Sequence, residues 1–421
     1  MQRQVLALIA SSTGNLLEWY DFGLFSSFAL IFAQLFFPDS IPAVALVKVF
    51  GIYALGFLCR PLGALLFGIM GDHKGRAKTL RASILLISLP TFLIAFVPSF
   101  QTAGILGPVL LVCLRLIQGI SLGGEFTGTL IYLTEIAPPR HRALYASLAG
   151  TIANLGFLAA NGIAFLLRQF MSPSMFTLYG WRVAFIIGGL IGLLILYLRR
   201  MLIETSTFVH LQEQHRIVPT PFMTALKQFP RKMLLVVGLA MLGAVFYYTW
   251  FIYLFNLLPA TQLAHSTVEL LQSLCLGCML ILVPLGGWVC DLLGRRYSFF
   301  IVAGGVFSCA WLCFHWITSG HLGLTLTGLG ILTVLSSLEQ ATTSVTVVEQ
   351  VPAVVRYTAL SVSYNLTQAI FGGTGPLIAA WLVFVWHNPT APAFYLMVIA
   401  AITFGTSFLC LKDTRQVNLE A

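Results

Sequence analysis

Charged residues are scarce in this chain. They make up 9% of its 421 residues, whereas hydrophobic residues make up 58%. Together with a mean hydropathy of +0.91, this composition excludes a soluble domain and predicts an integral membrane protein. The long apolar stretches also lack the short alternation of apolar and polar residues found in the strands of a membrane β-barrel, so we expect an all-α protein.

The sequence also lacks the motifs of several enzyme classes. It contains no nucleotide-binding loop of the form GxxxxGK[ST] and no zinc-hydrolase motif HExxH, so neither ATP-driven pumping nor zinc hydrolysis is supported. All eight cysteines lie within or at the ends of apolar stretches, which gives no sign of an exported disulfide framework. We therefore expect no enzyme activity, no cofactor and no metal site.

Hydropathy and its breaks predict twelve transmembrane helices, each with the ~20 apolar residues that cross ~30 Å of hydrocarbon. We expect them near residues 5–37, 45–70, 79–98, 103–136, 143–170, 181–199, 233–258, 269–290, 298–317, 322–349, 357–386 and 392–411. The longest polar interruption separates the first six from the last six. The predicted organisation is a six-helix bundle over 1–199, a cytoplasmic linker over 200–232, and a second bundle with a short cytoplasmic tail over 233–421.

Basic residues are unevenly distributed between the two sides of the predicted membrane. If both termini are cytoplasmic, the outer segments hold only Lys48, Arg168 and Arg182, and nearly all other basic residues, Arg199 among them, lie in the inner segments. This asymmetry fixes the orientation by the positive-inside rule. It also accounts for most of the net charge of +9, so the basicity of the chain is no argument for nucleic-acid binding.

Two loop motifs occur twice, once in each half. The first comprises Gly71, Asp72, Gly75 and Arg76 in GDHKGRAK and Asp291, Gly294 and Arg295 in CDLLGRR; the second comprises Glu135 and Arg142 in EIAPPRHR and Glu349 and Arg356 in EQVPAVVR. Two like-oriented repeats are what a two-bundle transporter requires. We interpret these residues as gating residues, with Asp72 capping a helix of the other half in one conformation. The alternative is an ordinary turn with positive-inside charges.

The first predicted span carries two acids, Glu18 and Asp21, near the middle of its apolar length. They are three residues apart and so share one face of a helix. Acids at this depth are rare and are candidates for a proton or substrate site. Two like charges so close disfavour double ionisation, which suits a group that binds and releases a proton. The alternative is a permanent structural ion pair.

Arginines lie at a similar depth in the second and fourth spans. A bare Arg60 or Arg115 would be costly there, and pairing with Glu18 or Asp21 would compensate it. Arg60 could instead make a bidentate contact with a substrate carboxylate. Asp21 is the better candidate for the proton and Glu18 for holding an arginine, although the reverse is open.

Further residues could wall a substrate site. The predicted substrate-binding set is Arg60, Tyr20, Glu125, Tyr247, Phe251, Asn365 and Gln368. The last two precede Gly372, Gly373, Gly375 and Pro376, which should break or kink the eleventh span. Close helix packing and an interfacial aromatic belt are the alternatives for these segments. Glu339 is a third acid in an apolar span, and no partner can be assigned to it.

Five segments, GNLLEWYDF, LCRPLGALLFG, GDHKGR, LRLIQGISLGGE and SYNLTQAIFGGTGP, resemble the metabolite:proton symporter branch of the major facilitator superfamily. The resemblance covers nearly the whole chain. It implies two six-helix bundles, alternating access, and proton-coupled uptake of small organic acids or zwitterions across a bacterial inner membrane. It also implies that Asp72 and Asp291 hold the opposite bundle's helix, and that the RxxQGxxxG pattern, here Arg115, Gln118, Gly119 and Gly123, serves proton coupling.

We therefore predict a proton-coupled symporter, with Glu18, Asp21 and Arg115 as coupling residues, that imports a small carboxylate-bearing metabolite: an organic acid, an amino acid or a betaine-like zwitterion. We expect a monomer in the bacterial inner membrane whose partners are protons, the solute and the lipid bilayer. Two alternatives remain, which are an exporter of the same fold, for example of a siderophore, and a non-transporting membrane sensor.

Overall fold

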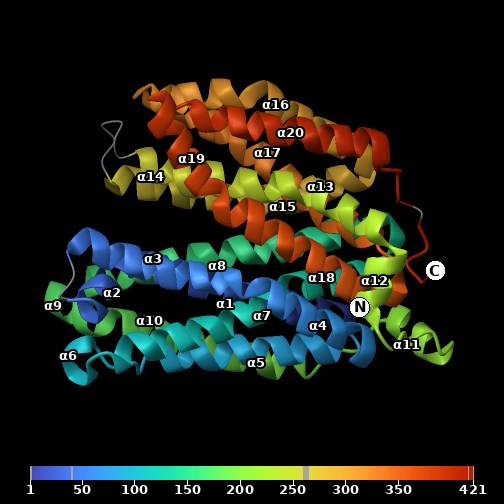
Figure 1. Ribbon diagram of the computed structural model, residues 1–421, viewed down its shortest axis with the longest axis horizontal. Coiled ribbons are helices and arrows are strands. Elements are labelled where there is room, and N and C mark those ends of the chain that lie inside the picture. The colour runs from blue at the N-terminus through green and yellow to red at the C-terminus, as the bar shows by residue number, and fades with distance from the viewer. Residues whose placement is uncertain (1, 39–40, 259–264, 416, 421) are drawn as a thin grey trace.

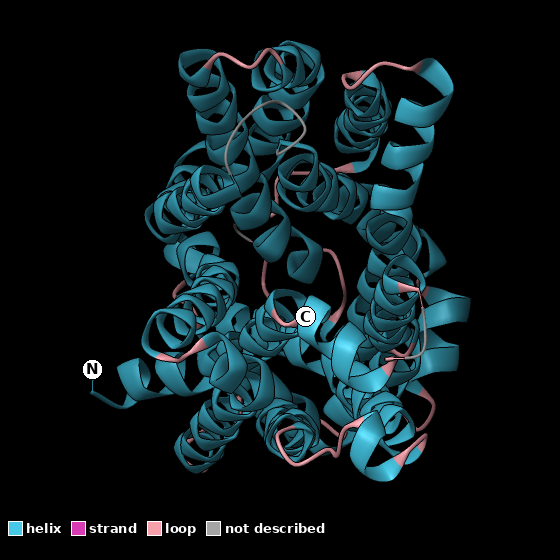
Figure 2. Ribbon diagram, turned by 90° about the vertical axis from the view of Figure 1, so that its left-hand side faces the viewer, coloured by secondary structure: helices cyan, strands magenta, loops and turns pink. Residues whose placement is uncertain are grey.

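The computed structural model describes residues 2–38, 41–258, 265–415 and 417–420, and every regular element in that part of the chain is a helix. Figure 1 shows the helices running along the long axis in two layers, with the N-terminal half (blue to green) below the C-terminal half (yellow to red). Figure 2 looks along the helices and shows the two groups end-on. The side chain of Arg3, which the sequence places on the inner side, lies outside the described residues.

The N-terminal bundle contains the helices α1 to α10. Their bounds are α1 Gln2–Ser27, α2 Ala29–Phe36, α3 Pro42–Leu58, α4 Arg60–Lys74, α5 Arg76–Ile94, α6 Phe100–Ala103, α7 Leu106–Ile136, η1 Pro139–His141, α8 Arg142–Phe170, α9 Pro173–Met175, η2 Phe176–Gly180 and α10 Trp181–Arg199. Two short helices follow in the linker segment: α11 Ser206–Glu213 and α12 Pro221–Gln228.

The C-terminal bundle contains the remaining helices. Their bounds are α13 Pro230–Phe246, η3 Tyr247–Leu254, α14 Phe255–Leu257, α15 His265–Leu293, α16 Arg295–Thr318, α17 Leu322–Glu349, η5 Ala353–Val355, α18 Arg356–Thr367, η6 Gln368–Gly372, α19 Gly373–Trp386 and α20 Ala391–Cys410. Each bundle holds a large buried apolar cluster, and a third cluster, which includes Phe67 and Leu360, joins the two bundles.

The described helices confirm the prediction of twelve spans. Eleven are long and apolar enough to cross a membrane singly, and the pair Ala7–Ser27 and Ala29–Phe36 makes the twelfth. That first span is not the straight helix expected over 5–37, because the pair is bent by 63°. The bend falls at Phe28, whose φ of −100° and ψ of 8° depart from helical geometry.

Two later spans contain wide turns at membrane depth. Residues Tyr247–Leu254 in the seventh span and Gln368–Gly372 in the eleventh form π-helix. The second of these lies where the glycines and Pro376 predict a break, and the helix resumes directly as α19. Short π segments interrupt regular helix hydrogen bonding and often occur at functional sites. Both face the interface between the bundles, as described below.

The most extensive contacts between the bundles are those of α4 with α18 and of α8 with α15. Glycines bring the backbones close in both. A Cβ on Gly68 of α4 would lie 2.8 Å from Cα of Thr358, and one on Gly287 of α15 would lie 2.7 Å from the carbonyl oxygen of Ala143. Such distances leave no room for a larger residue, so both contacts depend on glycine.

Candidate functional site

One end of the molecule carries the repeated loop motifs around Gly75 and Gly294 together with residues 411–415 and 417–420, which we call the C-terminal segment. We call this end the motif end (right in Figure 1). Gly75 and Gly294 have φ values of +98° and +96°. These values lie in the left-handed region that favours glycine, which explains why both turns carry one. Each turn places the preceding aspartate of its motif at the end of a helix.

The two aspartates cap helices of the opposite bundle. Asp72 accepts hydrogen bonds from the backbone N–H groups of Tyr357 at 3.1 Å and of Thr358 at 2.9 Å, at the start of α18. Asp291 accepts from the backbone N–H groups of Ala143 and Leu144, both at 3.0 Å, at the start of α8. A carboxylate at a helix N-terminus satisfies unpaired amides and favours the positive end of the helix dipole.

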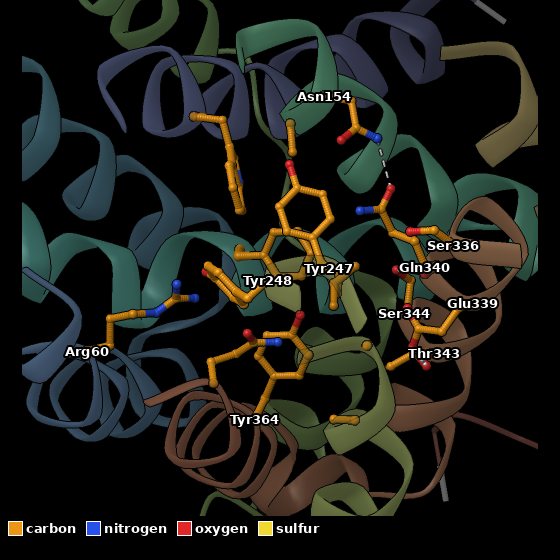
Figure 3. A pocket seen from close by; sticks show the side chains of 17 residues that line it. Arg60, Asn154, Tyr247, Tyr248, Ser336, Glu339, Gln340, Thr343, Ser344 and Tyr364 are labelled. Carbon is orange, nitrogen blue, oxygen red and sulfur yellow. Dashed lines mark hydrogen bonds between the residues drawn. The ribbon is translucent and has the colours of Figure 1, made fainter. Parts of the chain in front are cut away.

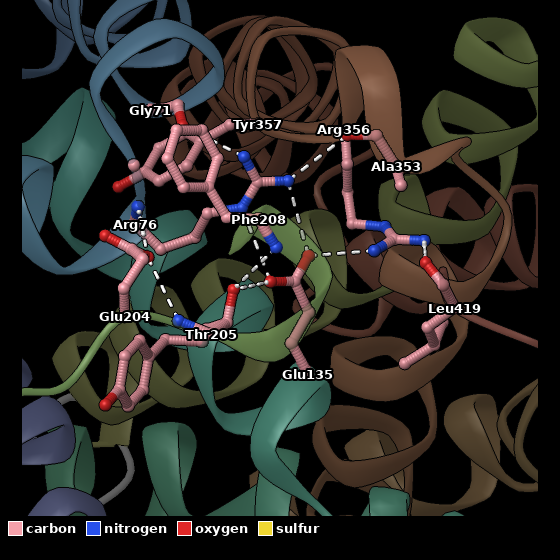
Figure 4. A network of polar contacts seen from close by, with 12 residues as sticks. Gly71, Arg76, Glu135, Glu204, Thr205, Phe208, Ala353, Arg356, Tyr357 and Leu419 are labelled. Atoms are coloured by element: carbon pink, nitrogen blue, oxygen red, sulfur yellow. Dashed lines mark hydrogen bonds and ion pairs between the residues drawn. The ribbon is translucent and has the colours of Figure 1, made fainter. Parts of the chain in front are cut away.

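The glutamates of the second motif each join arginines from both bundles. Glu135 accepts from Arg356 at 2.8 Å and pairs with Arg76 at 3.3 Å (Figure 4). Its counterpart Glu349 pairs with Arg295 at 3.0 Å and with Arg142 at 3.8 Å. All of these charged groups are buried. Opposite charges therefore compensate one another across the interface at this end of the molecule.

Segments that follow each bundle complete these networks. The hydroxyl of Thr205 donates to Glu135 at 2.6 Å, and that of Thr414 donates to Glu349 at 2.5 Å. Arg142 also donates to the carbonyl of Val417 at 2.7 Å, and Arg356 to that of Leu419 at 2.8 Å. The C-terminal segment thus contacts arginines of both bundles and helps to close the motif end.

Deeper in the N-terminal bundle, Asp21 forms a buried ion pair with Arg115. It also accepts hydrogen bonds from the amide of Gln118 at 2.8 Å and the hydroxyl of Thr91 at 3.1 Å. The guanidinium of Arg115 lies over the ring of Phe25, 3.9 Å from its centroid. Nε and Nη2 of Arg115 are buried without a hydrogen-bond partner among the described residues, so Asp21 alone balances this charge.

Glu18 lies nearby but has no such partner. Its side chain is 1% exposed, and Oε2 makes no hydrogen bond within the part of the chain that the structure describes. The charges that act on it are Arg60, Glu125, Arg199 and Asp21. No ion pair between Glu18 and Arg60 is formed in this conformation of the described chain, so Glu18 does not hold Arg60 here.

Glu125 pairs with Arg199 within the N-terminal bundle and does not line the cavity described below. Ser83 donates to the same carboxylate at 2.6 Å. The sequence places Arg199 among the basic residues of the inner segments, but its side chain is not exposed as that of a loop residue would be. The side chain at the end of α10 turns inward and is fully buried, because the ion pair with Glu125 compensates its charge inside the bundle.

A cavity lies between the two bundles (Figure 3). It is lined by Trp19, Arg60, Phe126, Leu130, Ala153, Asn154, Ala240, Gly243, Tyr247, Tyr248, Ser336, Glu339, Gln340, Thr343, Ser344, Tyr364 and Gln368. Figure 3 shows Arg60 and Glu339 on opposite sides, with Tyr247, Tyr248 and Tyr364 between them. A cavity with a few convergent polar groups among aromatic side chains is typical of a small-molecule site.

The bundles also touch each other beside this cavity. The amide of Asn154 on α8 donates to the side-chain oxygen of Gln340 on α17 at 3.0 Å. Trp19 and Tyr247 stack edge to face, with ring centroids 5.8 Å apart. Phe57 and Tyr248 do the same at 5.9 Å. These contacts join the halves on several sides of the cavity, so its shape depends on how the bundles are placed.

Not every residue of the predicted substrate-binding set lies at the cavity. Arg60, Tyr247 and Gln368 line it. Asn365 lies behind Arg60 and accepts a hydrogen bond from its Nε at 3.0 Å, and Phe251 stacks on Tyr247 with ring centroids 5.1 Å apart. Tyr20, by contrast, points into the N-terminal bundle and donates to the carbonyl of Ala184 on α10 at 2.9 Å.

Sequence reasoning missed several lining residues. Trp19 adjoins Glu18 in the segment that sequence analysis singled out, and Tyr248 lies within the aromatic run of the seventh span. Both could have been named from those signals. No sequence pattern indicates that Gln340 or Tyr364 lines a cavity. Glu339 was recognised as an acid in an apolar span, but only the fold shows that it faces the cavity.

Comparisons with known proteins agree with this architecture. The family model described as sugar (and other) transporter matches residues 6–219. The proline/betaine transporter of Escherichia coli (strain K12) is 33% identical over 423 residues, which cover 97% of this chain and 83% of that protein. The glycine betaine/proline/ectoine/pipecolic acid transporter OusA of Dickeya dadantii (strain 3937) is 34% identical over 432 residues, which cover 98% and 84%.

Solved structures show the same fold. The proton:xylose symporter XylE bound to 6-bromo-6-deoxy-D-glucose superimposes with a TM-score of 0.84 at 17% identity, over 99% of this chain and 97% of that one. FucP in the outward conformation gives a TM-score of 0.71 at 14% identity, over 97% and 98%. The chain is a multi-pass membrane transporter rather than an enzyme, and it belongs to the sugar (and other) transporter family within the major facilitator superfamily.

Proposed function

We propose that this protein is a proton-coupled symporter that imports a small carboxylate-bearing metabolite across the bacterial inner membrane. The observation that carries the proposal is Arg60. Arg60 is 4% exposed and lines the cavity. Its Nε donates a hydrogen bond to the side-chain oxygen of Asn365, and the guanidinium forms no ion pair with any described residue. A buried guanidinium without an acid is costly, and its planar set of donors matches a carboxylate. A carboxylate-bearing solute would supply the missing charge.

The ion pair between Asp21 and Arg115 supports the proton as the coupling ion. The acid is buried at membrane depth, where ionisable groups typically mark proton or substrate pathways. Protonation of Asp21 would remove the only ion-pair partner that Arg115 has among the described residues. Arg115 would then need a new partner, and Glu18, whose Oε2 has none among the described residues, is the nearby acid that could provide it.

The motif end supplies the alternating-access step. We place it at the cytoplasmic face, as the distribution of basic residues predicts. There Asp72 and Asp291 hold the opposite bundles together through backbone amides. Such charge–dipole contacts stabilise by roughly 0.3–2 kcal/mol each, which is small enough to be broken and remade in every cycle. Their release would open the cavity to the cytoplasm.

The names of two relatives reduce the range of candidate substrates. Their names give proline and betaines as transported solutes, and these compounds carry a carboxylate and a cationic nitrogen. We therefore propose a small amino acid or betaine for this chain. The carboxylate would bind Arg60, with Tyr247, Tyr248 and Gln368 around the rest of the molecule.

Reconstitution in lipid vesicles tests the proposal. An imposed inward proton gradient should drive accumulation of radiolabelled L-proline or glycine betaine, and a protonophore should abolish it. Arg60→Gln should remove uptake, whereas Arg168→Gln, at an exposed arginine outside the cavity, should leave it unchanged. If no organic acid, amino acid or betaine accumulates under the gradient, the symport proposal is wrong. Net loss of label from preloaded vesicles under the same inward proton gradient would instead indicate export.

A further inference from the structure

The C-terminal bundle contains a buried acid that the transport cycle proposed above does not use. Glu339 on α17 is 6% exposed and lines the cavity opposite Arg60 (Figure 3). Its one hydrogen-bond partner among the described residues is the hydroxyl of Thr343, which donates to Oε1 at 2.6 Å. No lysine, arginine or histidine of the described chain forms an ion pair with it.

An isolated carboxylate in this position is unusual. Ionised side chains removed from water cost several kcal/mol unless an opposite charge compensates them. Most other acids buried in or beside the spans differ in this respect, Glu18 being the exception: Asp21, Glu125, Glu135 and Glu349 each pair with an arginine. Glu339 therefore needs a positively charged partner, and no described residue provides one.

The surroundings of Glu339 leave room for such a cation. Gly243 of α13 faces the carboxylate, and a Cβ at that position would lie only 2.7 Å from its Cδ. A side chain there would cover the acid, whereas glycine leaves it facing the cavity. Trp19, Tyr247, Tyr248 and Tyr364 line the space between Glu339 and Arg60. The faces of aromatic rings attract cations, including quaternary ammonium groups.

We propose that Glu339 is the specificity-determining residue of this transporter: it binds the cationic nitrogen of a zwitterion whose carboxylate binds Arg60. The proposal rests on the proposed function, because it concerns the same cavity. A dicarboxylate would place its second negative charge against Glu339, and the repulsion would exclude it. A neutral group in the same place would leave Glu339 without a counter-charge. The pair of opposite charges thus selects zwitterions over acids of the same size.

Two pairs of compounds test this selectivity directly. Glycine betaine and 3,3-dimethylbutanoate have the same shape, but one carries a quaternary nitrogen where the other carries a carbon. L-Proline and cyclopentanecarboxylate form a second pair. Their dissociation constants are measured by isothermal titration with the purified full-length protein, as wild type and as Glu339→Gln. Binding is used because it does not require proton coupling, so it separates this proposal from the proposed function.

The wild type should prefer each zwitterion over its monocarboxylate counterpart, and Glu339→Gln should reduce that preference about 10- to 100-fold, which corresponds to about 1.4–2.8 kcal/mol. The loss should come from weaker zwitterion binding. Affinity for the two monocarboxylates, which lack the cationic nitrogen, should stay the same or rise. Thr343→Val provides the matched control, because it removes the hydrogen bond but keeps the carboxylate, and it should retain most of the preference.

Other outcomes would overturn the proposal. An equal loss of affinity for both members of a pair would assign Glu339 a structural role. An unchanged preference would show that the acid is neutral or remote from the ligand, and a wild type that binds neither zwitterion would remove the site altogether. Zwitterion selectivity that depends on Glu339 without gradient-driven accumulation would leave this proposal standing and overturn only the proton-coupled transport.

Discussion

At the motif end, the two halves of the molecule make the same contacts twice, whereas their interiors differ. Asp72 caps α18 as Asp291 caps α8, and Glu135 and Glu349 each join two arginines. The interior of the N-terminal bundle holds several charged residues, among them Glu18, Asp21, Arg60, Arg115 and Glu125, and nearly all of them are paired or near an opposite charge. The described interior of the C-terminal bundle holds one, Glu339.

The difference assigns separate tasks to the two regions. A bundle pair that must rock about a central site needs equivalent contacts on both sides of the interface, and the duplicated loops provide them. Proton binding and substrate recognition need no symmetry, because a proton and a zwitterion each require one set of charges. We therefore expect equivalent substitutions in the two halves of the motif end to have similar effects. A substitution in the interior of one bundle should have no equivalent in the other.

The largest expected effect follows neutralisation of Asp21. Asp21→Asn imitates the protonated acid and leaves Arg115 without its charge partner, and breaking a buried pair typically costs ~3–5 kcal/mol. Gradient-driven uptake of glycine betaine in vesicles should fall at least about 100-fold. Exchange of labelled for unlabelled solute, which needs no net proton movement, should persist in part.

The control for this variant is Glu213→Gln in the linker segment, where the acid is exposed. It should change neither uptake nor exchange. Unaltered pH-driven uptake in Asp21→Asn would remove Asp21 from the coupling mechanism. Loss of both uptake and exchange, with normal thermal stability, would make the residue a substrate-binding group instead and would weaken the division of tasks proposed here.

A smaller, paired effect is expected at the helix caps. Asp72→Asn should expose the amides of Tyr357 and Thr358, and Asp291→Asn those of Ala143 and Leu144. The lost charge–dipole contact is worth up to ~2 kcal/mol, so hydrogen–deuterium exchange at these amides should accelerate by about tenfold. Mass spectrometry of peptides from α8 and α18 measures it.

Each cap variant serves as the control for the other. Because the two caps share no residue, Asp72→Asn should leave exchange at the start of α8 nearly unchanged, and Asp291→Asn should leave that of α18 unchanged. Faster exchange at both helices in either variant would show that the caps open together. Faster exchange in only one of the two variants would contradict the equivalence of the halves.

The sequence predicts the symmetric region better than the interior. The span count follows from hydropathy, and the duplicated motifs can be recognised by comparing the halves, because both signals are local. The pairing of Glu125 with Arg199 could not be predicted in this way. Arg199 is the last residue of α10 and Arg200 follows it, and only the rotation of α10 against its neighbours decides that the first is buried and the second exposed.

Side-chain direction limits the prediction of the cavity for the same reason. Tyr20 and Tyr247 are both aromatic residues at membrane depth, but one donates to a carbonyl inside its bundle while the other lines the interface. A helix presents a new face with every residue, so the facing side cannot be read from composition. The bend at Phe28 likewise has no proline or glycine to announce it.

The smallest expected effect concerns the two threonines that complete the glutamate networks. Thr205→Val and Thr414→Val each remove one hydrogen bond to a buried carboxylate, which costs about 0.5–1.5 kcal/mol because each carboxylate keeps its arginine partners. Both variants should lower the apparent melting temperature by similar amounts, whereas Thr327→Val, at an exposed threonine of α17, should not. Thr205 precedes the linker helices, whereas Thr414 belongs to the C-terminal segment. Equal decreases in melting temperature would show that these two different segments stabilise the two glutamates equally. If Thr414→Val alone left the melting temperature unchanged, the C-terminal segment would not stabilise the glutamate network. The equivalence of the two halves at the motif end would then not extend beyond α20.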